Sequence, residues 1–264
     1  MSNPFATEEM AAGYAAARPP VHPRVLAEYF AQREDDRVDM SVDLGCGAGL
    51  STRALVPYAS RVLGLEPAVL MLRLARGLVP GAAFAAAAGE ALPLRPGSVD
   101  LITAAGSLNY VRELDQCFDE MRRVLRPDGS VLVYDFGAGR RFNTRDELNG
   151  WFEAFVARYP YPASEARPLD PDILATLARG FDLHRQSPFV IGLPMSRPAY
   201  EAYILTETNV AAAMRHGETL GGIGAWVHAA LSQFWDDDSR EVLFEGYWAE
   251  LSVTKTRMTP PLQP

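Results

Sequence analysis

The chain has 264 residues, of which 48% are hydrophobic, and a formal net charge of −8. This length and apolar content suffice to bury a full core, so one domain with an insertion is expected. The acidic balance, with no lysine–arginine cluster that approaches the size of a nucleic-acid footprint, argues against a nucleic-acid partner.

The first half of the chain alternates between strand-like and helix-like segments. An alanine-rich helical arm over 7–18 and a second helix over about 22–33 come before the first strand. Such alternation specifies a parallel sheet with right-handed crossovers, which is a doubly wound α/β fold. The expected strands are 40–44, 61–66, 82–86, 99–104 and 129–136, and the expected helices are 49–58, 67–77 and 113–125.

The second half departs from this alternation. A helical block over 196–236 separates the sixth strand from the last strand, and ligands of such sheets bind at the carboxyl ends of the strands. We therefore expect this block to form a lid over the site. The other expected elements are helices at 144–157 and 171–179 and strands at 182–193 and 241–255. The expected organisation is an arm at 1–38, a core at 39–195 and 237–256, the lid at 196–236 and a tail at 257–264.

The sequence has no pattern typical of a membrane or secreted protein. No apolar stretch reaches the roughly 18 residues of a membrane span, and the first residues lack the charged-then-apolar pattern of a leader. Cys46 and Cys117 are the only cysteines and do not suggest a disulfide framework. We therefore expect a cytoplasmic protein without a membrane association. The run Asp236-Asp237-Asp238 is interpreted as a solvated helix end, and no metal site is expected.

A glycine-rich turn follows the first strand, in Val42-Asp43-Leu44-Gly45-Cys46-Gly47-Ala48-Gly49. Glycines at alternate positions let the backbone turn tightly and let a ligand approach it closely. A strand that leads through such a turn into a helix is where α/β proteins bind nucleotide-like ligands. The dinucleotide phosphate loop needs glycine at its sixth position, where this chain has Leu50, and no Gly-Lys-Ser/Thr follows. The turn therefore does not predict a phosphate-binding loop.

An acid at the end of the second strand narrows the ligand class. Glu66 lies close to the roughly 20-residue spacing expected for a carboxylate that binds a ribose diol. Asp43, the three glycines and Glu66 together resemble the first motifs of the class I, Rossmann-like S-adenosylmethionine-dependent methyltransferases. Three further segments resemble later motifs of that family in the same order: Gly89–Leu94, Gly97–Ile102 and Arg123–Ser130.

The resemblance implies a seven-stranded doubly wound sheet whose last strand is antiparallel, with S-adenosyl-L-methionine as cofactor. Many relatives carry an aspartate that accepts from the adenine amino group where this chain has Ala88, so the backbone of Gly89 and Glu90 has to substitute. The residues expected around the cofactor are Tyr14, Arg18, Asp43, Gly45, Gly47, Gly49, Glu66, Pro67, Met71, Gly89, Glu90, Ser107 and Leu108.

The acceptor is less well defined by the sequence. The segment 104–110 lacks the Asn/Asp-Pro-Pro-Tyr signature of enzymes that methylate amino groups of nucleobases or glutamine. Methyl transfer from a sulfonium mainly requires positioning, and a base is needed only if the acceptor must lose a proton. Glu207 and Asp135 are the candidate bases. The candidate substrate-binding residues are Asn109, Tyr203, Glu207 and Asn209.

The expected function is in-line methyl transfer from S-adenosylmethionine to a small-molecule metabolite, by a monomer or homodimer. Two alternatives remain open on these residues. One is an enzyme that cyclises the aminobutyryl arm of the same cofactor, and the other is a non-catalytic cofactor-binding regulator.

Overall fold

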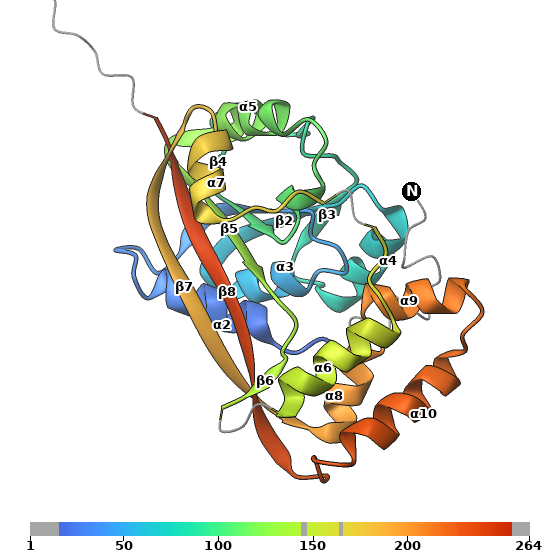
Figure 1. Ribbon diagram of the computed structural model, residues 1–264. Coiled ribbons are helices and arrows are strands. Elements are labelled where there is room, and N and C mark those ends of the chain that lie inside the picture. The colour runs from blue at the N-terminus through green and yellow to red at the C-terminus, as the bar shows by residue number, and fades with distance from the viewer. Residues whose placement is uncertain (1–15, 144–146, 164–165, 255–264) are drawn as a thin grey trace, which may run out of the picture.

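A computed structural model describes residues 16–143, 147–163 and 166–254, and Figure 1 shows one twisted sheet with helices on both faces. The sheet has eight strands in the order β3-β2-β1-β4-β5-β8-β6, and β7 pairs with β8. The strands are β1 (Val38–Leu44), β2 (Ala59–Leu65), β3 (Ala83–Ala85), β4 (Val99–Ala105), β5 (Leu125–Phe136), β6 (Arg141–Phe142), β7 (Phe181–Ser196) and β8 (Ser239–Val253).

Strands β1 to β5 run parallel to one another, and β8 runs antiparallel to β5, β6 and β7. The expected doubly wound sheet with an antiparallel last strand is confirmed. The two-residue strand β6 was not foreseen, because so short a pairing leaves no periodicity to read. The long β7–β8 ribbon starts at Phe181 opposite Val253 and ends at Ser196 opposite Ser239.

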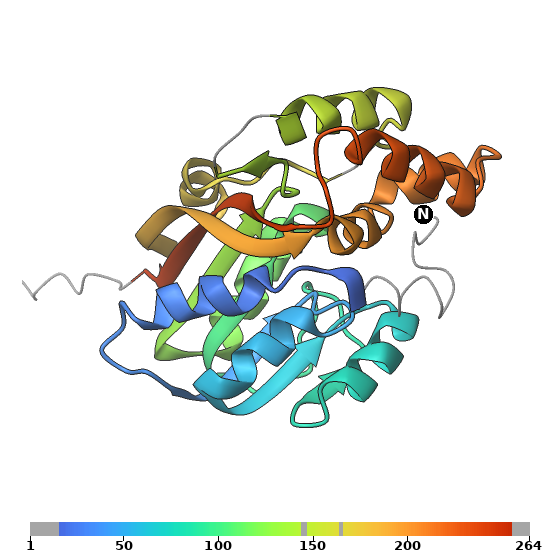
Figure 2. The same ribbon diagram turned by 90° about the horizontal axis from the view of Figure 1, so that it is seen from below.

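The helices of the core are α2 (Val21–Phe30), α3 (Leu50–Leu55), α4 (Val69–Leu78), α5 (Leu114–Val124), α6 (Glu147–Arg158) and α7 (Pro171–Leu177). Both faces of the central strands are buried, as expected for parallel sheets. On β5, Leu132 and Tyr134 pack in the core formed with α2 and α3, while Val131 and Val133 pack in the core formed with α5 and α7. Figure 2 shows α2 and α3 together on one side of the sheet.

Two local signals explain helix boundaries. The helix expected over 49–58 ends early at Leu55 and continues as a 3-10 turn over Val56–Tyr58, because Pro57 has no N–H to donate. The helix α7 begins as expected, with the Asp170 carboxylate accepting from Ile173 N and proline in the first turn.

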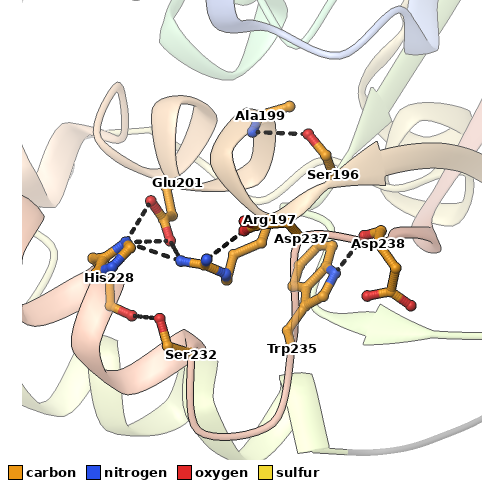
Figure 3. A network of polar contacts seen from close by, with 9 residues as sticks. All are labelled: Ser196, Arg197, Ala199, Glu201, His228, Ser232, Trp235, Asp237 and Asp238. Atoms are coloured by element: carbon orange, nitrogen blue, oxygen red, sulfur yellow. Dashed lines mark hydrogen bonds and ion pairs between the residues drawn. The ribbon is translucent and has the colours of Figure 1, made fainter.

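The helical block between β7 and β8 consists of α8 (Arg197–Ile204), α9 (Thr208–Arg215) and α10 (Leu220–Leu231). Figure 3 shows the polar contacts that hold its two ends together. The buried Arg197 donates to Glu201 Oε1 at 2.7 Å, pairs with Asp237 and lies 2.9 Å from His228 Nδ1. Asp237, from the acidic run, therefore joins the segment after α10 to the start of α8. No helix in the described ranges is long and apolar enough to cross a membrane.

Candidate functional site

The glycine turn after β1 depends on glycine at all three positions. Gly45, Gly47 and Gly49 have φ values of 69°, 51° and 89°, which L-residues with a Cβ rarely adopt. The N–H groups of Gly45 and Cys46 both donate to Leu65 O, at 2.8 and 3.0 Å, so the turn is fastened to the end of β2. A Cβ on Gly45 would lie 2.4 Å from Ser107 Cβ, whereas one on Gly47 would lie an ordinary 3.7 Å from Met71 Cε. The turn therefore lies tightly against the residue Ser107, which follows β4, at Gly45 and has more free space at Gly47.

Glu66 leaves β2 directly beside this turn. Its Oε2 accepts from Gly47 N at 3.1 Å and its Oε1 accepts from Ala68 N at 2.9 Å. The carboxylate is half-buried and held in one orientation by two backbone donors. Met71 is buried next to Gly47, and Pro67 is exposed at the same edge.

Asp43 lies beneath the turn instead of at its surface. Its buried carboxylate accepts from Ser51 and Thr52, both at 2.6 Å, and from Thr103 at 2.9 Å. Burial raises the pKa of Asp43, and the three hydroxyl donors oppose that rise. These bonds connect β1, α3 and β4. The expectation that Asp43 contacts the cofactor is corrected here, because its side chain is enclosed and acts on the turn from below.

The segment after β4 joins the ends of three strands. Ser107 Oγ donates to Leu44 O at 2.6 Å, and Leu108 is fully buried in the core. Asn109 Nδ2 donates to Asp135 Oδ2 at 3.2 Å, and Phe136 N donates to Asp135 Oδ1 at 2.8 Å. Burial raises the pKa of Asp135. The structure therefore brings Asn109 and Asp135 together at the carboxyl ends of β4 and β5, but places Leu108 in the interior.

Gly89 and Glu90, which are expected to flank an adenine, both lie against α5 (Leu114–Val124) or the residue before it. A Cβ on the buried Gly89 would lie 2.7 Å from Cys117 Sγ, so this position requires glycine. Glu90 Oε1 accepts from Glu113 N at 3.3 Å, at the start of α5. Glu90 is thus engaged with α5 and not with the glycine turn.

Arg18 and Glu207, predicted for different tasks, are partners of one another. Arg18 Nη2 lies 3.1 Å from Glu207 Oε1, and the guanidinium lies 5.2 Å from the centroid of the Tyr203 ring. Tyr161 donates from its hydroxyl to Glu207 Oε2 at 3.0 Å. Both oxygens of Glu207 therefore have a partner. Tyr14, expected beside Arg18, lies outside the described residues.

Two residues expected to contact the substrate lie in the interior. Tyr203 is buried beneath Arg18. Asn209 is fully buried, donates from Nδ2 to Tyr159 O at 2.8 Å and accepts at Oδ1 from Val210 N at 3.0 Å. This placement does not support a substrate contact by Asn209. Its amide instead ties the first turn of α9 to the residue after α6.

The structure also shows a cavity of about 350 Å³ where the chain leaves β5. Sequence reasoning missed it, although the paired arginines Arg140-Arg141 just past β5 were a signal that could have found it. Its lining residues are Gly137, Ala138, Arg140, Arg141, Phe152, Tyr161, Leu243 and Glu245. Tyr161 is 41% exposed and thus belongs to this wall and not to the aromatic core formed by its neighbours on α6.

His22, which follows Pro19-Pro20, is not among the residues predicted for the site from the sequence. Its Nδ1 lies 2.9 Å from the hydroxyl of Tyr134, and its ring packs edge-on to Phe136. Burial, with a smaller effect of Arg18, lowers the pKa of His22 to about 4. A neutral imidazole therefore lies beside the carboxyl end of β5.

Residues 42–133 match the family model described as a methyltransferase domain. The chain is 33% identical over 151 residues to malonyl-[acyl-carrier protein] O-methyltransferase of Geobacter sulfurreducens, covering 56% of this chain and 55% of that protein. It is 30% identical over 130 residues to CRG1 of Saccharomyces cerevisiae, assigned as an S-adenosylmethionine-dependent methyltransferase, covering 45% of this chain and 44% of that protein. The aligned region thus spans about half the length of these curated relatives.

The structure resembles that of a protein from Anaeromyxobacter dehalogenans assigned to the type II methyltransferases. The TM-score is 0.67 at 24% sequence identity, and the match covers 89% of this chain and 96% of that one. At that identity the likeness establishes the fold.

Proposed function

We propose that this chain, which carries a class I, Rossmann-like methyltransferase domain at residues 42–133, transfers a methyl group from S-adenosylmethionine to a small-molecule acceptor. The observation that carries the proposal is the position of Glu66. Its carboxylate is fixed beside a left-handed glycine turn by Gly47 N and Ala68 N. A carboxylate has about four acceptor sites, so Glu66 has capacity left to accept from the two hydroxyls of a ribose.

The surrounding residues fit this cofactor. Gly45 and Gly47 have no side chain, so a ligand can approach the backbone of the turn closely. Met71 and Pro67 provide apolar surface next to Glu66. Asp43 holds the turn in shape from below through three hydroxyls. S-adenosylmethionine supplies a methyl group that its sulfonium has already activated, so the protein has mainly to orient the two reactants and exclude water.

Some methyl acceptors must lose a proton to a general base. Asp135 is better placed than Glu207 to be that base. Asp135 lies at the carboxyl end of β5 with its orientation set by Asn109 and Phe136 N. The pKa of Asp135 is raised toward physiological pH, and a base whose pKa lies near the working pH exchanges protons more effectively. Glu207 is engaged by Arg18 and Tyr161. We assign Glu207 to holding the lid against the arm.

The proposal is tested by calorimetric titration with S-adenosylhomocysteine, the product of methyl transfer, followed by chromatography of an incubation with S-adenosylmethionine. Saturable binding is expected, and absence of binding heat would contradict the proposal. Methylthioadenosine formed from the cofactor alone would support cyclisation of the aminobutyryl arm instead, because that reaction needs no acceptor.

A further inference from the structure

We infer that the cavity between β5, β6, α6 and β8 binds the anionic end of the acceptor, a carboxylate or phosphate on a small apolar body. The inference rests on the proposed function, because it names the class of molecule that receives the methyl group. It is carried by the lining of the cavity, which combines Arg140 and Arg141 with the apolar side chains of Phe152 and Leu243.

The backbone that carries Arg140 is fixed from both sides. Gly137 N donates to Glu245 O at 2.9 Å, and Tyr200 of α8 donates from its hydroxyl to Gly139 O at 2.7 Å. On the other side, Arg141 pairs with Leu243 in the β6–β8 register. A Cβ on Gly139 would lie 2.6 Å from Val242 Cγ1, so glycine is what allows the chain to lie this close to β8. Arg140 is therefore exposed to solvent on a stretch of backbone that these contacts hold in place.

The lining of the cavity carries a net positive charge among the described residues. Arg141 forms an ion pair with Glu245, which leaves Arg140 as the surplus charge of the cavity. Among the described residues no acid pairs with Arg140. The whole chain has a net charge of −8, so a cavity with a surplus of positive charge differs from the rest of the molecule. Arginine presents a planar fork of donors that matches carboxylate and phosphate, and a concave site focuses its field.

The cavity also has a place for an apolar body and a connection to the lid. Phe152 on α6 is buried and Leu243 on β8 is partly buried, and the volume of about 350 Å³ suits a small metabolite. Tyr161, on the cavity wall, donates to Glu207, the residue before α9. Figure 1 shows α6, α8 and α10 gathered beside β6, at the end of the sheet opposite α5. An acceptor held here would lie against the arm-to-lid contact.

The test titrates three matched probes into protein saturated with S-adenosylhomocysteine: trans-cinnamate, phenyl phosphate and the neutral trans-cinnamamide. At least one anion is expected to bind about tenfold more tightly than the amide. Arg140→Gln should abolish that preference, and Glu245→Gln should increase it because it frees Arg141. Arg24→Gln removes an exposed arginine of α2 and is the matched control, expected to leave the preference unchanged.

Three results would overturn the inference: equal binding of anions and amide, failure of both anions to bind, or an anion preference that persists in Arg140→Gln. Circular dichroism and thermal melting establish that each variant is folded. Since S-adenosylhomocysteine binding is measured first in the same samples, its absence would contradict the proposed function. Its presence without an anion preference would contradict only the inference about the cavity.

Discussion

The guanidinium of Arg18 lies 3.1 Å from the carboxylate of Glu207, so the segment before α2 is joined to the segment before α9. Their side chains are 21% and 11% exposed, which makes this a largely enclosed pair. Tyr161 and Tyr203 complete the contact from two other elements. The helical block is thereby coupled to the N-terminal segment at the carboxyl edge of the sheet.

We expect Arg18→Met and Glu207→Gln each to lower the free energy of unfolding by about 1–3 kcal/mol, since each removes the ion pair from a largely enclosed site. The double variant should cost less than the sum of the two, which urea denaturation measures as a coupling energy. The exposed pair Arg179–Asp115 is the matched control, with an expected coupling near zero. Strict additivity for Arg18 and Glu207 would contradict the coupling of the N-terminal segment to the helical block.

A second prediction concerns the glycine turn. Gly45→Ala should destabilise the protein by about 2 kcal/mol or more and abolish cofactor binding, because the residue has φ of 69° and its new Cβ would meet Ser107. Gly77→Ala on α4 is the control. Its Cβ would meet no described atom within 4 Å, and alanine favours the helix by about 0.5–1 kcal/mol. Urea denaturation measures the stability of both variants, and calorimetry measures their binding of S-adenosylhomocysteine. A Gly45→Ala variant as stable as wild type, with unchanged binding, would contradict the prediction.

The conformation of the glycine turn and the carboxylate beside it were predictable from the sequence as local structure, and the long-range pairings were not. Gly45 and Glu66 follow from short-range rules about turns and about the ends of strands. Arg18 and Glu207 were both identified, but their ion pair was not foreseen, because it forms only when the helical block of α8 to α10 is folded. Asn209 was predicted to bind substrate, and in the structure its amide donates to Tyr159 O, because a polar group in an apolar helix can pair with a buried backbone carbonyl as readily as with a ligand. Arg140 could not be identified as a cavity residue from the sequence, because its position depends on the pairing of the adjacent two-residue strand β6 with β8.

The third prediction concerns pH. Burial lowers the pKa of His22 to about 4, below its ordinary value of 6.5, so the unfolded chain binds a proton more readily than the folded one. Stability from this residue is present above pH 6.5 and is lost as the pH falls toward 4, by up to about 1.4 kcal/mol per pH unit.

Unfolding by urea at pH 7 and pH 5 measures this loss, which should shrink in His22→Gln. His216→Gln, at an exposed position, should leave the pH dependence unchanged. An NMR titration that placed the His22 pKa near 6.5 would contradict the lowered pKa of this half-buried imidazole.

The central claim is that Glu66 binds the ribose of S-adenosylmethionine, and calorimetric titration of S-adenosylhomocysteine into Glu66→Ala tests it most directly. The variant removes a carboxylate that two backbone donors hold beside the glycine turn. We predict a loss of about 1–3 kcal/mol in binding free energy relative to wild type, with Glu34→Ala, at an exposed position, binding as wild type. Equal affinity of wild type and Glu66→Ala would contradict the account.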